Sequence, residues 1–176
     1  MSTPTPPEAP RVLGVDPGLQ VTGYAVLEGR PRGPRVLEAG IVRSAEGRAT
    51  TDLAQRLRNL YDGIVEVLEQ YRPTAVAVEQ LFAHYEHPRT AILMAHARGV
   101  IFLAAAQRGL PVKSYNATRI KKTITGSGRA SKEQVQYTIQ RELGLAQLPE
   151  PADVADALAA ALCHYYIQKL AAGGAR

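Results

Sequence analysis

Three short runs rich in β-branched residues follow one another at the start of the chain, at residues 11–15, 21–27 and 36–42. Each run has the residue types and length of a β-strand, and turn-forming Pro and Gly residues lie between them. Because the links are short, the three strands are predicted to form an antiparallel meander. The rest of the fold must then be built on a sheet.

Helical and strand-like segments alternate after this meander. A helix is expected to begin near residues 50–52, with Thr50 or Thr51 as N-cap, and its apolar positions recur every three or four residues up to Tyr71. An apolar, Ala-rich helix over 89–108 is expected to be sandwiched against the sheet. Strands are expected at 74–78 and 110–114, a helix with a capping box at Ser131 and Gln134, and a last helix from Pro151, as first helical residue, to about Leu170.

This order of elements predicts an α/β fold, with a mixed five-stranded sheet and helices on both faces. The length of 176 residues fits one domain, expected over 11–170. A disordered Pro-rich extension is expected at 1–10 and a flexible tail at 171–176. The single Cys excludes a disulfide framework within the chain, and no stretch is expected to cross a membrane.

The positive charge of the chain is concentrated in one segment. The formal net charge is +5, from 21 Lys and Arg against 16 Asp and Glu. Residues 108–141 contain eight basic residues and a single acid, Glu133. A solvated, lysine-rich face would produce the same run of charge. Its confinement to about one fifth of the chain favours a surface that binds phosphates.

Carboxylates stand where the strands and the last helix are expected to meet. Asp16 follows the first strand and Glu79 ends the fourth. Neighbouring parallel strands, about 4.8 Å apart, would carry both to one edge. Asp153 and Asp156 are three residues apart and share one face of the final helix. Taken singly, these acids have simpler explanations, namely turn formation, solvation and stabilisation by the helix dipole.

Four carboxylates that meet require cations. Two like charges about 4 Å apart repel by about 4 kcal/mol at an effective dielectric constant of 20. Two divalent ions would cancel four negative charges, and ligation by oxygen alone favours Mg²⁺ or Mn²⁺ over Zn²⁺. Such an ion pair clamps an in-line phosphoryl displacement. An acidic metal site beside a basic patch therefore predicts a nuclease.

Four segments, in this order along about residues 11–166, resemble the RuvC family of bacterial Holliday-junction resolvases. They are LGVDPGLQVTGY at 13–24, VAVEQLF at 76–82, IKKT..G.G...KEQVQ at 120–136 and PADVADALAAALCH at 151–164. The resemblance implies an RNase H-like fold of the retroviral-integrase superfamily and a homodimer. It also implies magnesium-dependent nicking of two opposed strands of a four-way DNA junction in recombination and repair. The implied setting is the bacterial cytoplasm, beside the RuvA–RuvB branch-migration complex.

The resemblance assigns roles by position. Two metal ions, Mg²⁺ or in its place Mn²⁺, are expected at four acids: Asp16, Glu79, Asp153 and Asp156. Some members of the family have His at the position of Asp153, so an all-carboxylate site is expected here. Lys121 and Lys132 match lysines linked to DNA binding or catalysis, and Phe82 matches an aromatic that stacks near the junction centre, worth about 1–3 kcal/mol per base. Weaker expectations of phosphate contact concern Arg119, Lys122 and Arg129.

Three other functions remain open on the sequence alone. The chain could be a nuclease that acts on RNA, or another integrase-like enzyme. It could be a junction-binding module without catalysis, in which the acids are structural. It could also be an ATPase like actin or the sugar kinases, whose phosphate loop follows a first-strand Asp-x-Gly, although 176 residues are few for that two-lobed fold.

Overall fold

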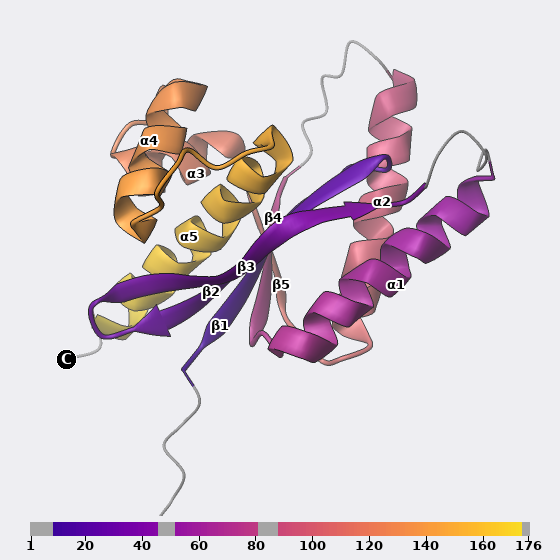
Figure 1. The fold of residues 1–176 in the computed structure, drawn as a ribbon, viewed down its shortest axis with the longest axis horizontal. Helices are drawn as coiled ribbons and strands as arrows, with labels where there is room; N and C mark the ends of the chain where they lie inside the picture. The colour runs from indigo at the N-terminus through magenta and orange to yellow at the C-terminus, as the bar shows by residue number, and fades with distance from the viewer. Residues whose placement is uncertain (1–8, 46–51, 81–87, 174–176) are drawn as a thin grey trace, which may run out of the picture.

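The computed structural model describes residues 9–45, 52–80 and 88–173, and within them five strands form one mixed sheet (Figure 1). The strand order is β3-β2-β1-β4-β5. The first three strands are antiparallel neighbours, as expected, and the other two run parallel to β1. The strands are β1 (Arg11–Asp16), β2 (Val21–Arg30), β3 (Gly33–Arg43), β4 (Ala75–Glu79) and β5 (Val112–Tyr115). The helices of the described ranges are α1 (Leu53–Tyr71), α2 (Pro88–Ala106), α3 (Ala117–Thr125), α4 (Lys132–Leu143) and α5 (Ala152–Gly173).

Alternate side chains of β1 enter two separate cores. Val12 belongs to the core that α3, α4 and α5 complete, whereas Leu13 and Val15 belong to the core that α1 and α2 complete. Figure 1 shows the same division, with α5 along one side of the sheet and α1 and α2 on the other. Helices therefore cover both faces, which confirms the predicted layers.

The beginnings of α1 and α5 differ from the expected ones by a residue or two. Asp52 is the N-cap of α1, and its carboxylate accepts a hydrogen bond from the Ala54 amide at 3.2 Å. The expected caps, Thr50 and Thr51, lie outside the described residues. Pro151 precedes α5 instead of starting it, and its carbonyl accepts the first helical hydrogen bond, from Val154 at 3.0 Å.

The start of α4 and the end of α5 can also be compared with the predicted boundaries. The capping box at Ser131 and Gln134 is present at the start of α4, as predicted. The last helix continues to Gly173, beyond the expected end at Leu170.

Helix α3 was not predicted. It contains two buried apolar side chains, Ile120 and Ile124, which is too few for a clear amphipathic pattern in nine residues. Its ends carry the stronger signals, because the Asn116 side chain caps its first turn and Gly126 ends it with a φ of 82°. This helix fixes the directions in which the basic side chains of the segment point.

Helix α2 packs against the sheet as expected, but no described residue covers its outer side. It packs against α1 and presents its outer side to solvent, where Ile92, Leu93 and Leu103 are 56%, 38% and 52% exposed. By length and composition alone it could also cross a membrane, contrary to the expectation for this chain. Within this fold, however, its Arg98 is hydrogen-bonded to the sheet. The exposed apolar side of α2 is thus a surface without a partner among the described residues.

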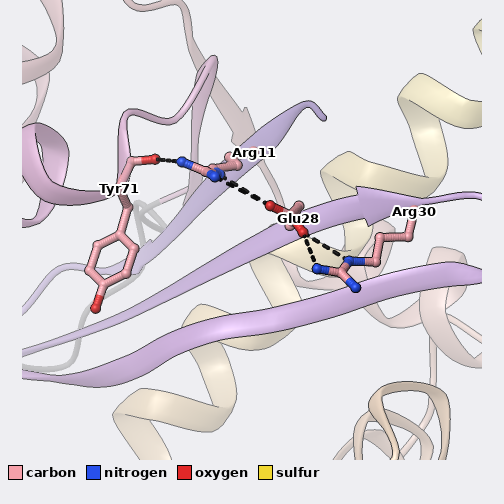
Figure 2. A network of polar contacts seen from close by, with 4 residues as sticks. All are labelled: Arg11, Glu28, Arg30 and Tyr71. Atoms are coloured by element: carbon pink, nitrogen blue, oxygen red, sulfur yellow. Dashed lines mark hydrogen bonds and ion pairs between the residues drawn. The ribbon is translucent and has the colours of Figure 1, made fainter. Parts of the chain in front are cut away.

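A buried charge network holds the end of the sheet opposite to Asp16 (Figure 2). Glu28 of β2 is 8% exposed and accepts hydrogen bonds from Arg11 at 3.3 Å and from Arg30 at 2.8 Å. Arg11 also donates to the carbonyl of Tyr71, at the end of α1, at 2.9 Å. Because the carboxylate of Glu28 is paired on both oxygens, its burial is compensated, and its role is structural.

Candidate active site

Asp16 and Glu79 lie side by side at one edge of the sheet. In the parallel pairing of β1 with β4, Val15 is opposite Val78. Asp16 and Glu79 are the next residues and the last ones of their strands. The predicted meeting of these two acids at the carboxyl ends of neighbouring strands is therefore what the fold produces.

Two glycines let α5 bring its acids to this edge. Gly23 of β2 is the Cα partner of Asp16, and a Cβ built on it would lie 2.0 Å from the carbonyl oxygen of Asp153. One turn further along α5, a Cβ on Gly14 would lie 2.1 Å from the carbonyl oxygen of Ala157. No real side chain fits in either place. The backbone of α5 thus lies directly on the strands, and its first turns stand over Asp16.

The charge on Asp16 is strongly disfavoured at this edge. Its pKa is raised from an ordinary value of 3.8 to about 7. Burial is the largest cause, followed by the negative charges of Asp156, Glu79 and Asp153, in that order. Lys132 acts in the opposite direction. Carboxylates from β1, β4 and α5 are therefore close enough to repel one another.

Lysines from α3 and α4 offset part of this negative charge. Burial and the charge of Asp156 raise the pKa of Glu79, whereas Lys121 and Lys132 lower it. The Nζ atom of Lys132, in the first turn of α4, lies 3.4 Å from Oδ2 of Asp156. Since this pair is largely exposed, it contributes little stability. The pair matters because it places the positively charged ammonium group of Lys132 beside the acids.

The acids fit a divalent cation by donor type and charge. They offer oxygen ligands alone, which suits Mg²⁺ or Mn²⁺, and a cation would relieve the repulsion that raises the pKa of Asp16. Within the described residues, no three His, Cys, Asp or Glu side chains stand close enough together, as they are, to hold one ion. Mutual repulsion opposes a closer approach of bare carboxylates. The site therefore has the ligand set for a metal but not the closed arrangement around it.

The other basic residues predicted to bind DNA lie on α3 and in the turn that follows it. Arg119 and Lys122 line a groove of about 1400 Å³ with Tyr166 and Leu170, between α3 and the far half of α5. Lys121 is the α3 residue whose charge acts on Glu79. Arg129 is exposed in the turn between α3 and α4. Phe82 lies outside the described residues.

Sequence reasoning missed Gly14 and Gly23. Glycine inside a strand has a recognisable meaning, because it weakens the strand and marks a close approach of another backbone. Both glycines lie in the segment 13–24 that carries Asp16. That signal would have indicated that something packs directly against β1 and β2, although not that it is the helix with the other two acids.

The family comparison and the curated relatives of this chain agree with each other. The family described as crossover junction endodeoxyribonuclease RuvC matches residues 12–164. A protein of that name from Rhodopirellula baltica is 50% identical over 167 residues, which cover 94% of this chain and 91% of the relative. The one from Moorella thermoacetica is 45% identical over 153 residues, which cover 87% and 89%. Thermus thermophilus RuvC in complex with Holliday junction substrate superposes with a TM-score of 0.84 at 32% identity, covering 92% of this chain and 96% of that one.

Proposed function

The chain belongs to the RuvC family of crossover junction endodeoxyribonucleases, and from this premise we propose that it resolves Holliday junctions by hydrolysing phosphodiester bonds in two opposed strands. Its fold is RNase H-like, as in the RuvC structures that it matches. The observation that carries the proposal is the meeting of Asp16 and Glu79 with the first turns of α5 at one sheet edge. An acidic cluster flanked by lysines suits hydrolysis of a phosphate ester.

The acids would hold the metal that this chemistry needs. Asp16 and Glu79 on the sheet and Asp153 and Asp156 on α5 supply the ligands, and two Mg²⁺ ions, or Mn²⁺ in their place, would match their charge. When bound, the ions supply an activated water and stabilise the leaving oxygen. The chain itself brings its two pairs of carboxylates to the same edge of the sheet, because Gly23 lets α5 touch β2. No covalent nucleophile from the protein is needed.

The experiment that tests this function compares four substrates. A synthetic four-way junction with Mg²⁺ should be nicked in two opposed strands, while a linear duplex of the same sequence should be left intact. Efficient cleavage of an RNA–DNA hybrid instead would indicate a nuclease for RNA. Tight junction binding without products would indicate a binding module, and turnover of ATP would indicate the kinase-like alternative.

Lys121 and Lys132 are proposed to bind the phosphates next to the cut, because both lie beside the acids. Replacing both by Gln should reduce the slope of log affinity against log salt by about 1.8 for duplex arms, at about 0.9 per lost phosphate contact. The measurement is junction binding in EDTA at several salt concentrations. Arg58→Gln, an exposed cation on α1, is the control and should leave the slope unchanged. An unchanged slope in the double variant would remove the two lysines from phosphate contact.

Phe82, Arg119, Lys122 and Arg129 are proposed as further DNA contacts of the same protein. Arg119 and Lys122 support this by their position in the groove along α3, which extends the positive surface away from the acids. Both side chains line this groove, whereas Lys121 does not, which favours contact with a junction arm over contact with the cut phosphate. Single changes at these positions should lower affinity without lowering the cleavage rate of bound junction.

A homodimer is proposed because a four-way junction can adopt two-fold symmetry and a C2 dimer presents the same site twice. The exposed apolar side of α2 gives such a dimer a surface to bury. Leu103→Asp should therefore halve the mass in sedimentation, whereas Leu170→Asp, on α5 at 74% exposure, should not. A Leu103→Asp protein that still sediments as a dimer would exclude this face. We also propose that the protein acts in the bacterial cytoplasm and that the RuvA–RuvB complex is its partner.

A further inference from the structure

The end of β4 that carries Glu79 has incomplete backbone support. On one side, the Gln80 amide donates to the carbonyl of Tyr115 in β5 at 2.8 Å. On the other side, β1 ends at Asp16 and continues with Pro17, which has no amide hydrogen to donate. The parallel ladder between β1 and β4 therefore stops where the acids begin. The carbonyl oxygen of Glu79 therefore has no backbone donor on the β1 side in the described part of the chain.

Arg98 of α2 reaches this position. Its Nη1 atom donates to the carbonyl oxygen of Glu79, and its Nη2 atom donates to the Ser114 hydroxyl of β5 at 2.6 Å. The guanidinium also lies over the ring of Phe102, with its carbon 4.7 Å from the ring centroid. The planar guanidinium group thus bridges the ends of β4 and β5, and its stacking on Phe102 of the same helix fixes its orientation.

We propose that Arg98 is a positioning residue for the hydrolytic reaction: it holds the Glu79 backbone in place and so sets the position of the Glu79 carboxylate among the metal ligands. This rests on the proposed metal-dependent function. Arg98 does not contact the acids' side chains, and it acts through the main chain of β4. A displacement of a reacting group by about 1 Å can lower a rate by about 100-fold, so a loose strand end is enough to impair the site.

Lysine at this position keeps the positive charge and loses the fork. Its single ammonium group cannot reproduce the two diverging hydrogen bonds of a guanidinium. In Arg98→Lys, we expect the single-turnover rate at saturating junction to fall 10- to 100-fold. Junction affinity in EDTA should stay within twofold of the wild type, because Arg98 is proposed to touch neither DNA nor metal. The affinity for Mn²⁺ without DNA, measured by calorimetry, should fall at least threefold.

Two further variants separate positioning from general stability. Arg30→Lys changes a comparable hydrogen bond of a guanidinium, to Glu28 at 2.8 Å, at the opposite end of the sheet, and should leave rate and Mn²⁺ affinity unchanged. Ser114→Ala removes only the second bond of Arg98 and should keep most of the rate. A folded Arg98→Lys protein with normal rate and Mn²⁺ affinity would overturn the proposal. So would equal losses in Ser114→Ala, or losses in Arg98→Lys that follow a matching loss of junction binding and thermal stability.

The calorimetric result also keeps this proposal distinct from the proposed function. If the wild type binds Mn²⁺ but does not cut junctions, the function fails while the comparison of Arg98→Lys with the wild type still stands. If the wild type cuts junctions and the two proteins bind Mn²⁺ alike, the positioning role fails and the function stands.

Discussion

Replacing Asp16 by Asn is expected to lower the rate of junction cleavage by about 1,000-fold or more, equivalent to about 4 kcal/mol in the activation barrier. Asp16 lies at the centre of the acidic cluster, where three other carboxylates act on it. An amide keeps the shape but removes the charge that would bind a divalent ion. Junction binding in EDTA should stay equal or become tighter, because one negative charge near the phosphates is gone. Single-turnover cleavage and equilibrium binding measure the two effects separately.

Asp62→Asn provides the matched control, since Asp62 is an exposed acid on α1 that pairs with Arg58. It should cleave like the wild type. Cleavage by Asp16→Asn at more than a tenth of the wild-type rate would contradict the metal role of Asp16. Joint loss of binding and cleavage would instead indicate that Asp16 is needed for folding.

The same exchange should change how stability depends on pH in metal-free protein. The unfolded chain releases the Asp16 proton near its ordinary pKa of 3.8, whereas the folded chain keeps it up to about pH 7. Between these values the native state binds more protons, so this group lowers the free energy of unfolding as pH rises. Asn cannot titrate, and melting curves in EDTA from pH 4 to 8 should show a smaller decline for Asp16→Asn. Parallel curves would contradict the raised pKa.

Gly23→Ala is expected to lower cleavage by about 100-fold in a protein that still folds. A methyl group there would collide with the Asp153 carbonyl, so the start of α5 must move away from β2 and take two acids with it. Overpacking of this kind costs about 1–3 kcal/mol of unfolding free energy. Raising the Mn²⁺ concentration should recover part of the rate, because the ligands remain present but lie further apart.

Gly29→Ala, on the same strand, is the control for this change. Its new methyl group would meet side-chain atoms of Pro10 and Tyr165 at 3.3 Å, which can shift by a few tenths of an ångström. Cleavage should therefore remain close to normal. If both variants lose activity alike, disturbance of β2 as a whole is responsible and the contact with α5 is not.

The part of the site that sequence could predict is the part that strand order determines. The short links between the first three strands predicted the meander. The strand after the first helix was predicted to run parallel to the first strand and to bring Glu79 beside Asp16, and the pairing of Val15 with Val78 confirms this arrangement of the strands. Helix-capping residues were equally informative. The capping box at Ser131 predicted the start of α4 and therefore the position of Lys132.

What sequence could not predict depends on tertiary packing. Helix α3 has only two buried apolar residues, and its position depends on the core that it shares with α4 and α5. Neither its existence nor the opposite directions of Lys121 and Arg119 could therefore be predicted. A lone Arg98 in an apolar helix gives no sign of which carbonyl it reaches. The close approach of α5 to the sheet is possible because Gly14 and Gly23 have no side chains. What these glycines pack against is a segment about 130 residues further along the chain, which the local sequence does not reveal.

The contact at Gly14 and Gly23 fastens α5 to the sheet near the start of the helix. The helix has 22 residues and is therefore about 33 Å long. Further along, Tyr165 packs beside β2, and the hydroxyl of Tyr115 in β5 is hydrogen-bonded to the ring of His164. The helix is thus attached to the strands well beyond its first turns. The repulsion among the acids is therefore resisted by a long stretch of apolar packing, and α5 cannot lift off the sheet at one end without disturbing the rest.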